Sequence, residues 1–422
     1  MRRTLAISII CLLCLPLGAQ IAETDFPVDS TGICESAGEE EAADSQATID
    51  SLLSVWYKTR PVPVDTFAQL PDTAGVILTA DTPDSVLIAR LEKINSFITI
   101  PFNETVRRYM ILYSEKMDEK MSVMLAQSAY YFPLFEEILD KYDMPLELKY
   151  MSVIESALVP TARSRAGARG IWQFMYTTAR RYGLNINSFM DERLDVVKSA
   201  DAAARYLKDA YNVFGDWVLA ISSYNCGAGN VSKAIRRAGG SMKFWDIYPY
   251  LPRETRGYVP AFVGAMYAMV YHTAHGIEPG ASPLPIQVDT FLIQKNLHFK
   301  QVGEMVGVPV ELIKELNPQY THDIIPGKDR ACILRLPYNY TGKFLSVQDT
   351  LYTHKADSLI SPKIMKNISE GGNGNSICYK VRSGDNLGKI ALRYHCSVAQ
   401  LKKWNHLRSD MIRVGQVLYI YR

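Results

Sequence analysis

Hydrophobic and polar positions divide the chain into one long helical stretch and two short mixed stretches. Between residues 84 and 275, apolar side chains recur at intervals of three and four, most clearly in segments 86–97, 105–117 and 132–141. This spacing is typical of amphipathic helices, and the alternation typical of strands is missing from it. The pattern therefore predicts one all-α domain over residues 84–275.

Two short stretches follow, at residues 288–340 and 377–422, and each has the order strand, helix, helix, strand. Residues 308–317 align with residues 396–405, so the two stretches read as diverged copies of one small βααβ module. A small module repeated after a larger domain is typical of proteins that bind an extended ligand.

Three segments are expected to lie outside the regular domains. Residues 20–83 are acidic and rich in proline, which predicts a mostly irregular leader. Residues 276–287 are rich in glycine and proline, which predicts a linker before the first module. Residues 341–376 are polar and end in a run of glycine and asparagine, which predicts a flexible linker between the two modules.

The N-terminal residues have the pattern of an export signal. Arg2 and Arg3 precede an apolar run over residues 5–17, and Ala19 supplies a small residue for cleavage. We therefore expect residues 1–19 to be a signal peptide and the protein to be exported to the periplasm or cell envelope. The alternative is a retained anchor helix, which would associate the protein with a membrane.

Charge and composition exclude several classes of function. Hydrophobic residues make up 48% of the chain and charged residues 21%, as in folded soluble proteins. A mean hydropathy of −0.05 excludes a polytopic membrane protein. Lys and Arg number 46 against 44 Asp and Glu, so the chain lacks the basic balance of a nucleic-acid-binding protein.

The cysteines predict no metal site, and no motif predicts a cofactor. Cys14 follows Leu13, which is a poor match to a lipid attachment site, so lipidation at Cys11 or Cys14 is kept only as an alternative. The cysteines beyond the signal are odd in number and lack zinc-site spacing. They are Cys34, Cys226, Cys332, Cys378 and Cys396. Export permits disulfides, so Cys378 with Cys396 is the pair to test, and separate thiols are the alternative.

The last module begins with a strand and a tight turn over residues 379–387. Gly384 can adopt a positive φ, and Asp385 can cap the helix that begins near Leu387. Together with Asn405 and the closing strand, this spacing resembles the LysM module. LysM modules bind glycans that contain N-acetylglucosamine. The resemblance implies that the groove lies at residues 410–414 and at a four-residue turn. That turn is Gly384, Asp385, Asn386 and Leu387.

The charge of the last module and its glycan binding each have an alternative explanation. Residues 378–422 hold nine Lys or Arg against two acids, which suits a polyanionic wall, and solvated surface charge alone is the alternative explanation. A vestigial fold without binding is the other alternative. The first module keeps Asn317 and the Pro326-Gly327 pair but lacks the glycine turn, so it resembles a degenerate LysM whose glycan binding is undecided.

One glutamate in the helical domain is a candidate acid. Asp143 and Pro145 predict a helix start, and Leu148, Met151 and Glu155 then share one face. A carboxyl group on an apolar face is partly desolvated, which raises its pKa and suits a general acid. The alternative is a structural glutamate held by a cap or a salt bridge.

Four ordered motifs surround this glutamate. They are ES at residues 155–156, GIWQ at 170–173, SYNCG at 223–227 and ETRGYV at 254–259. Together they resemble the lytic transglycosylases of glycoside hydrolase family 23, which have the goose-lysozyme-like all-α fold. The family pattern has AYNAG where this chain has SYNCG, so Ser223 and Cys226 replace two alanines. The resemblance covers residues 97–275 and the modules.

The resemblance implies a peptidoglycan substrate, cleaved between N-acetylmuramic acid and N-acetylglucosamine with a 1,6-anhydromuramyl end as product. Glu155 would be the catalytic acid and base, without a metal or cofactor. The substrate-binding residues would be Ser156, Gln173, Tyr224, Asn225 and Tyr258, although helix packing or a capped loop would also explain the tyrosines and the glutamine. A hydrolytic muramidase on the same scaffold and a catalytically silent wall-binding protein are the competing functions.

Overall fold

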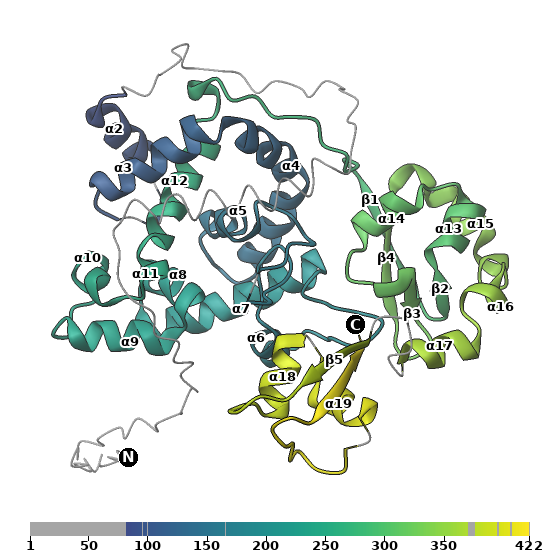
Figure 1. The fold of residues 1–422 in the computed structure, drawn as a ribbon. Coiled ribbons are helices and arrows are strands. Elements are labelled where there is room, and N and C mark those ends of the chain that lie inside the picture. Colours follow the sequence, from purple (N-terminus) through teal and green to yellow (C-terminus); the bar gives the residue numbers. More distant parts are fainter. Residues whose placement is uncertain are drawn as a thin grey trace, which may run out of the picture. The chain divides into compact units, whose positions relative to one another are not determined.

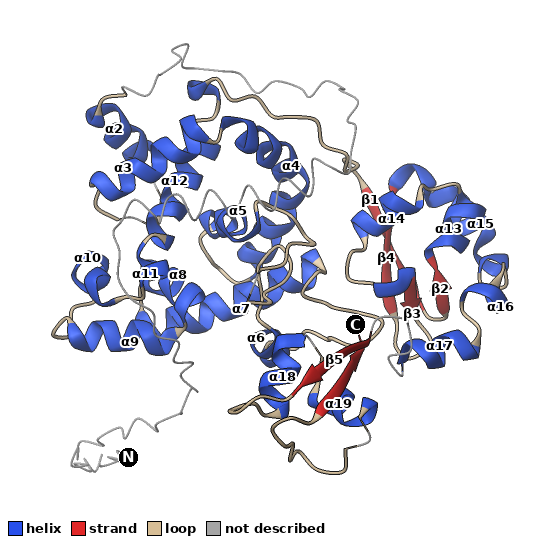
Figure 2. Cartoon of the chain, in the orientation of Figure 1, coloured by secondary structure: helices blue, strands red, loops and turns tan. Residues whose placement is uncertain are grey.

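The computed structural model describes residues 82–94, 96–98, 100–164, 166–369, 376–394, 396–405 and 407–421. The expected signal peptide and almost all of the expected leader lie outside these residues. The prediction of an all-α domain followed by small strand-containing modules is confirmed, since Figure 2 shows strands only in the C-terminal modules. None of the helices in the described ranges combines the length and hydropathy that a membrane span requires.

Helices connected by loops and short helical turns build the first domain (Figure 1). They are α2 (Asp84–Ile94), α3 (Glu104–Ile111), α4 (Asp118–Lys141), α5 (Met151–Ser156), α6 (Tyr176–Arg181), α7 (Val196–Phe214), α8 (Trp217–Cys226), α9 (Ala228–Arg237), α10 (Phe244–Ile247), α11 (Arg253–Arg256) and α12 (Tyr258–Val270). Among the described residues of this domain, β-pairing occurs only as isolated β-bridges.

The core of this domain is centred on α12, whose residues are buried from Tyr258 to Met269. A helix that is apolar on every side is stable only when other elements surround it. Helix α3 packs against it most closely at Gly264, where a Cβ atom would lie 2.6 Å from the carbonyl oxygen of Tyr109. The glycine therefore allows the two helices to approach each other.

The helix that bears Glu155 begins differently from the prediction. Asp143 adopts a positive φ of 51° and makes no cap. A 3₁₀ turn over Leu146–Tyr150 leads directly into α5, and Ala157 ends α5 in the left-handed conformation. Hence α5 is short, and Glu155 lies in its last turn.

Over residues 288–369, the first module contains two antiparallel strand pairs and five α-helices. Its elements are β1 (Val288–Ile293), β2 (Asn296–His298), α13 (Phe299–Val306), α14 (Val310–Leu316), β3 (Ile324–Pro326), β4 (Cys332–Pro337), α15 (Thr341–Leu351), α16 (Ala356–Leu359) and α17 (Pro362–Ser369). Strand β1 pairs with β4, from Val288 opposite Pro337 to Ile293 opposite Cys332, and β2 pairs with β3.

The prediction of a flexible linker over residues 341–376 is wrong for most of that segment. Helix α15 packs against α13, and its Phe344 and Leu351 are fully buried in the core of the first module. Phe344 also contacts the ring of Phe291 on β1, with ring centroids 4.3 Å apart. Phe344 and Leu351, with the partly buried Val347 between them, therefore anchor α15 to the core of the first module.

The second module consists of β5 (Ser376–Lys380), α18 (Leu387–Tyr394), α19 (Val398–Trp404) and β6 (Val417–Tyr421), with β5 antiparallel to β6. Its helices begin with side-chain caps. The Asn386 carboxamide oxygen accepts the Lys389 N–H, so Asn386 rather than Asp385 caps α18. Asp385 instead accepts from the Tyr379 hydroxyl and the Arg382 N–H, which closes the turn.

Of the two cysteines proposed as a pair to test, the structure describes the side chain of Cys396, and that of Cys378 lies outside the described residues. Cys396 is a free thiol, 4% exposed, in the hydrophobic core of the second module. Burial raises the pKa of this thiol to about 12, so it remains protonated and unreactive near neutral pH. The cysteine contributes to the core as a small apolar side chain.

Replacing Phe344 tests whether α15 belongs to the first module. Phe344→Ala removes a fully buried ring and should lower the free energy of unfolding of that module by about 3–5 kcal/mol. The matched control is the neighbouring Leu345→Ala, because Leu345 is 54% exposed. Thermal unfolding of the full chain measures both, and equal effects of the two variants would contradict the assignment.

Candidate active site

Glu155 is the acidic group at the centre of the site. It lies in the last turn of α5 with its side chain partly accessible to solvent. The hydroxyl of Tyr258, the first residue of α12, donates a hydrogen bond to Oε1 of Glu155. Among the described residues, Oε2 has no hydrogen-bond donor, so the proton of the neutral acid belongs on Oε2.

The surroundings favour the neutral form of this acid. Desolvation raises the pKa of Glu155 to about 7, although the hydrogen bond from Tyr258 acts in the opposite direction. Burial and the nearby Glu155 raise the pKa of Tyr258 well above its ordinary value, so its hydroxyl remains a donor. A carboxyl group that titrates near neutral pH can release and take up a proton with little cost in free energy.

The turn at residues 170–173 is forced close to the chain at Arg193. Gly170 has a φ of 87°, and a Cβ atom there would lie 1.8 Å from the Arg193 carbonyl oxygen. Gln173 adopts a φ of 47°, which is unfavourable for a residue with a side chain. Such local strain is characteristic of functional sites. The buried Trp172 contacts the Phe135 ring with centroids 5.1 Å apart, which anchors the turn in the core.

The Gln173 side chain is oriented by its own turn. Its amide nitrogen donates to the Gly170 carbonyl at 2.8 Å and to the Ala162 carbonyl at 3.3 Å. Its amide oxygen accepts from none of the described residues, so it is available to an N–H or O–H of a ligand.

The end of α8 brings Tyr224 and Asn225 to the same region. The Tyr224 hydroxyl donates to the Trp172 carbonyl at 2.8 Å. Burial raises the pKa of this tyrosine most, and the nearby charge of Glu155 raises it further. Asn225 is exposed, and its carboxamide oxygen accepts from the hydroxyl of buried Thr255 at 2.7 Å. The Asn225 amide N–H groups donate to none of the described residues and are available to a ligand.

The expectation that Ser156 lies in the cleft is not supported. Its side chain is fully buried, and its hydroxyl donates to the Ile171 carbonyl at 2.8 Å and the Ser152 carbonyl at 3.2 Å. Ser156 therefore connects α5 to the turn that bears Gln173. This hydrogen bond fixes the distance between the helix that bears Glu155 and the turn that bears Gln173.

Two residues near the site were missed by the sequence analysis. Tyr206 on α7 donates to the Ser223 carbonyl at 2.8 Å and contacts the Tyr224 ring with centroids 5.1 Å apart. It lies outside the four sequence motifs, so no motif indicated it. Thr255, which orients Asn225, lies inside the ETRGYV motif, so the motif itself was the available signal.

Cys226, which replaces an alanine of the family motif, is a partly buried free thiol. Its Sγ atom lies 3.4 Å from the Ser222 carbonyl oxygen within α8. Burial raises the pKa of this thiol, so it remains protonated. The substitution therefore changes packing beside Asn225 and adds no second ionised group.

The site contains one carboxyl group that can transfer a proton. In the described ranges, no second carboxylate contacts Glu155, and no cluster of three metal-ligating side chains occurs. Amide groups of Gln173 and Asn225 supply the remaining ligand-binding capacity. One acid, two amides and neighbouring tyrosines suit the protonation of a bond in a polar, ring-containing substrate.

Comparison with protein families identifies the class. A model described as "Transglycosylase SLT domain" matches residues 133–246, and a "LysM domain" model matches residues 379–420. A model described as "Lytic transglycosylase MltD, LysM-like domain" matches residues 287–353, which includes α15. The fold, the acid and these matches define a lytic transglycosylase that bears LysM modules.

Relatives then define the family. The chain is 31% identical over 337 residues to membrane-bound lytic murein transglycosylase D of Escherichia coli K12, covering 76% of this chain and 70% of the relative. The chain belongs to the membrane-bound lytic murein transglycosylase D family. It is also 36% identical over 97 residues to a putative tributyltin chloride resistance protein of an Alteromonas species, over 23% of this chain and 47% of the relative. A probable N-acetylmuramidase of Lactococcus lactis is 54% identical over 41 residues, or 10% of this chain and 9% of the relative.

Replacing the acid with its neutral isostere should stabilise the protein at high pH. A folded-state pKa of about 7 against 4.5 means that ionisation of Glu155 opposes folding. The neutral Glu155 stabilises the folded wild type fully below about pH 4.5, and this stabilisation is lost as the pH rises through 7. At pH 8 the free energy of unfolding of Glu155→Gln should therefore exceed that of the wild type by up to about 3 kcal/mol. Calorimetry at about pH 5 and pH 8 measures the gain.

The matched control for this experiment is Glu254→Gln, because Glu254 is exposed. It should have the same small effect at both pH values. A Glu155→Gln variant that is equally or less stable than the wild type at pH 8 would show that the carboxylate is not desolvated.

Proposed function

We propose that Glu155 acts in turn as the acid and the base of the lytic transglycosylase reaction on peptidoglycan. The observation that supports this most strongly is one desolvated carboxyl group with a pKa of about 7, held by Tyr258. Most glycoside hydrolases use two carboxyl groups, one as the acid and one as the base or nucleophile. A single carboxyl group requires the substrate to supply the second function.

In the proposed reaction Glu155 gives up one proton and later takes up another. The acid proton on Oε2 passes to the glycosidic oxygen between N-acetylmuramic acid and N-acetylglucosamine, and the bond from C1 to that oxygen breaks. The muramyl acetamido carbonyl stabilises the positive charge at C1. The Glu155 carboxylate then takes the proton of the C6 hydroxyl as O6 bonds to C1, which gives the 1,6-anhydromuramyl end and restores the acid.

The other site residues are proposed to orient the sugar. The free amide oxygen of Gln173 and the free amide N–H groups of Asn225 suit the N–H and C=O of an acetamido group. The ring of Tyr224, the residue before Asn225, packs against the ring of Tyr206, which fixes this end of α8. The desolvated carboxyl group of Glu155 and the aromatic residues around it favour attack by O6 over attack by water.

The second module is proposed to bind the glycan strand. A surface pocket of about 620 Å³ lies beside the predicted turn. Its lining residues are Tyr379, Lys380, Val381, Arg382, Tyr394, Val414 and Gly415. Of the residues predicted to bind glycan, Asp385 and Asn386 stabilise the turn and Leu387 is buried, so Lys380 and Arg382 are better candidates for ligand contact.

We also propose that the protein acts outside the cytoplasm, in the periplasm or cell envelope. The N-terminal pattern of two arginines and an apolar run supports export. The relative in Escherichia coli is described as membrane-bound. Peptidoglycan, the proposed substrate, lies in the same compartment.

The products of the reaction test the proposed chemistry. Mass spectrometry of fragments released from purified peptidoglycan should show anhydromuramyl ends, one water lighter than reducing ends. Glu155→Gln should lose roughly 10²–10⁴-fold in rate, the usual contribution of acid–base catalysis. Reducing ends that depend on Glu155 would instead indicate a muramidase, and sacculus binding without any release would indicate a silent wall-binding protein.

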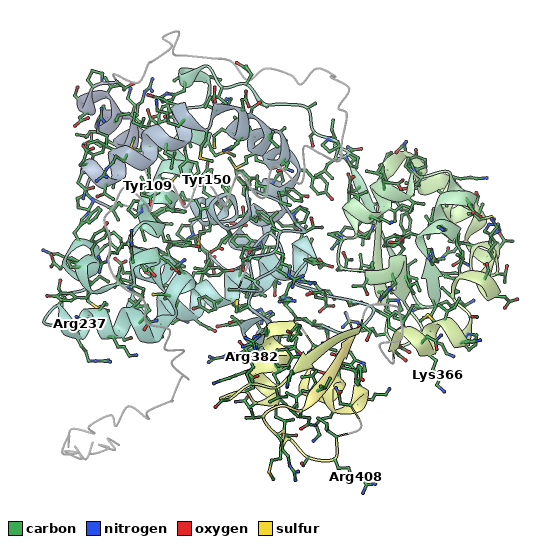
Figure 3. The ribbon with its side chains drawn as sticks, viewed as in Figure 1. Tyr109, Tyr150, Arg237, Lys366, Arg382 and Arg408 are labelled. Atoms are coloured by element: carbon green, nitrogen blue, oxygen red, sulfur yellow. The ribbon has the colours of Figure 1, made fainter. Side chains whose placement is uncertain are left out.

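Charge reversal in the pocket tests the role of the second module. Arg382→Glu should weaken binding of the full chain to sacculi by about 10-fold, because the pocket would repel a polyanionic wall. Arg408→Glu is the matched control, since Arg408 is exposed, lies outside the pocket and changes net charge equally. Figure 3 labels both arginines. Equal effects in sedimentation assays would show that only net charge matters.

A further inference from the structure

One segment of the catalytic domain makes a close contact with the first module. Residues 188–195 connect α6 to α7, and Met190 within them is 2% exposed because it is part of the hydrophobic core of the module. Met190 also forms an antiparallel β-bridge with Tyr320 of the module. A core that includes a residue from the catalytic domain cannot be completed by the module alone.

Backbone hydrogen bonds extend this contact. The Asp191 N–H donates to the Gln319 carbonyl at 2.9 Å, and the Thr321 N–H donates to the Phe189 carbonyl at 3.0 Å. The Thr321 hydroxyl donates to the Ser188 carbonyl at 2.5 Å. Paired backbone groups of this kind fix both position and direction, unlike contacts between flexible surface side chains.

Two ion pairs reinforce the same face. Arg335 on β4 is buried, and its guanidinium lies 3.1 Å from a carboxylate oxygen of Asp195. Arg330 pairs with Glu192, which is 2% exposed and also pairs with Lys198. Burial alone would raise the pKa of Glu192, but hydrogen bonds from Lys198 and its other partners lower it. A buried charge is destabilising unless it keeps a partner, so the buried Asp195 carboxylate depends on Arg335, whereas Glu192 is paired on two sides.

The segment that receives the module also holds the Gln173 turn. Asp191 pairs with Arg193, which is fully buried, and the Arg193 guanidinium donates to the carbonyls of Gly167 and Phe174 at 3.3 and 3.4 Å. The Arg193 carbonyl is the atom against which Gly170 packs. Arg193 therefore contacts the chain on both sides of the Gln173 turn, and it lies two residues from Asp191, which contacts the module.

We propose that the first module is an intramolecular brace of the catalytic domain, and that Arg335 is a positioning residue for the Gln173 turn. Arg335 holds Asp195, the N-cap of α7, while Gln319 and Thr321 hold the backbone of the preceding segment. The glycan-binding turn is degenerate in this module, which is consistent with a surface used for docking. The inference does not depend on which product the enzyme forms.

The experiment uses the full chain with a substitution at the docking face. Arg335→Met should lower kcat on a short soluble peptidoglycan fragment by about 10- to 100-fold at unchanged KM, because a displaced turn misplaces Gln173. Hydrogen exchange should accelerate at residues 188–195 and 167–174, whereas α12 stays protected. The matched control is Lys314→Met, since Lys314 pairs with Asp323 inside the module.

Each outcome decides the proposal. An unchanged kcat with unchanged exchange would show that the module is independent of the turn and would overturn it. A rise in KM alone would assign the module to substrate binding and would also overturn it. If Arg335→Met does not fold, Arg335→Lys and Thr321→Val are tested by the same measurements, and exchange at residues 167–174 that matches the wild type in both would overturn the proposal.

Discussion

The active site depends on the desolvation of one carboxyl group. Glu155 lies at the end of a short helix against the apolar α12, where the ionised form is poorly solvated and the pKa rises to about 7. The same environment that makes the carboxyl group a useful acid makes it costly to the folded state when it ionises. The catalytic domain tolerates this because α12 and the surrounding helices form a large buried core.

Much of the remaining domain serves to fix groups around that carboxyl. Ser156 joins α5 to the turn at residues 170–173, Tyr224 joins α8 to the same turn, and Thr255 orients Asn225. These hydrogen bonds fix the positions of the site residues and take no part in proton transfer. The contact of residues 188–195 with the first module extends this support beyond the catalytic domain.

The sequence predicted the all-α domain and the modules, because helical spacing and short motifs are local properties. Of the residues that the motifs nominated, Tyr258 and Tyr224 interact with Glu155. Prediction from the sequence failed where the outcome depends on distant contacts. Ser156 is adjacent to the acid yet turns toward Ile171, and only the fold shows that. Helix α15 looked like a linker because its anchors, among them Phe344 and Leu351, lie in a mostly polar segment, and the core that receives them comes from distant strands and helices. The burial of Cys396 likewise depends on the folded core of the second module.

The proposed mechanism requires Glu155 to be a desolvated acid, and its titration is the measurement to make. Infrared difference spectra of the wild type against Glu155→Gln isolate the carboxyl stretch of this one residue as the pH is varied. A midpoint of about 7 is expected. A midpoint near the ordinary value for glutamate, roughly 4.3, would contradict it, because the acid would then be ionised at the pH at which it must donate a proton.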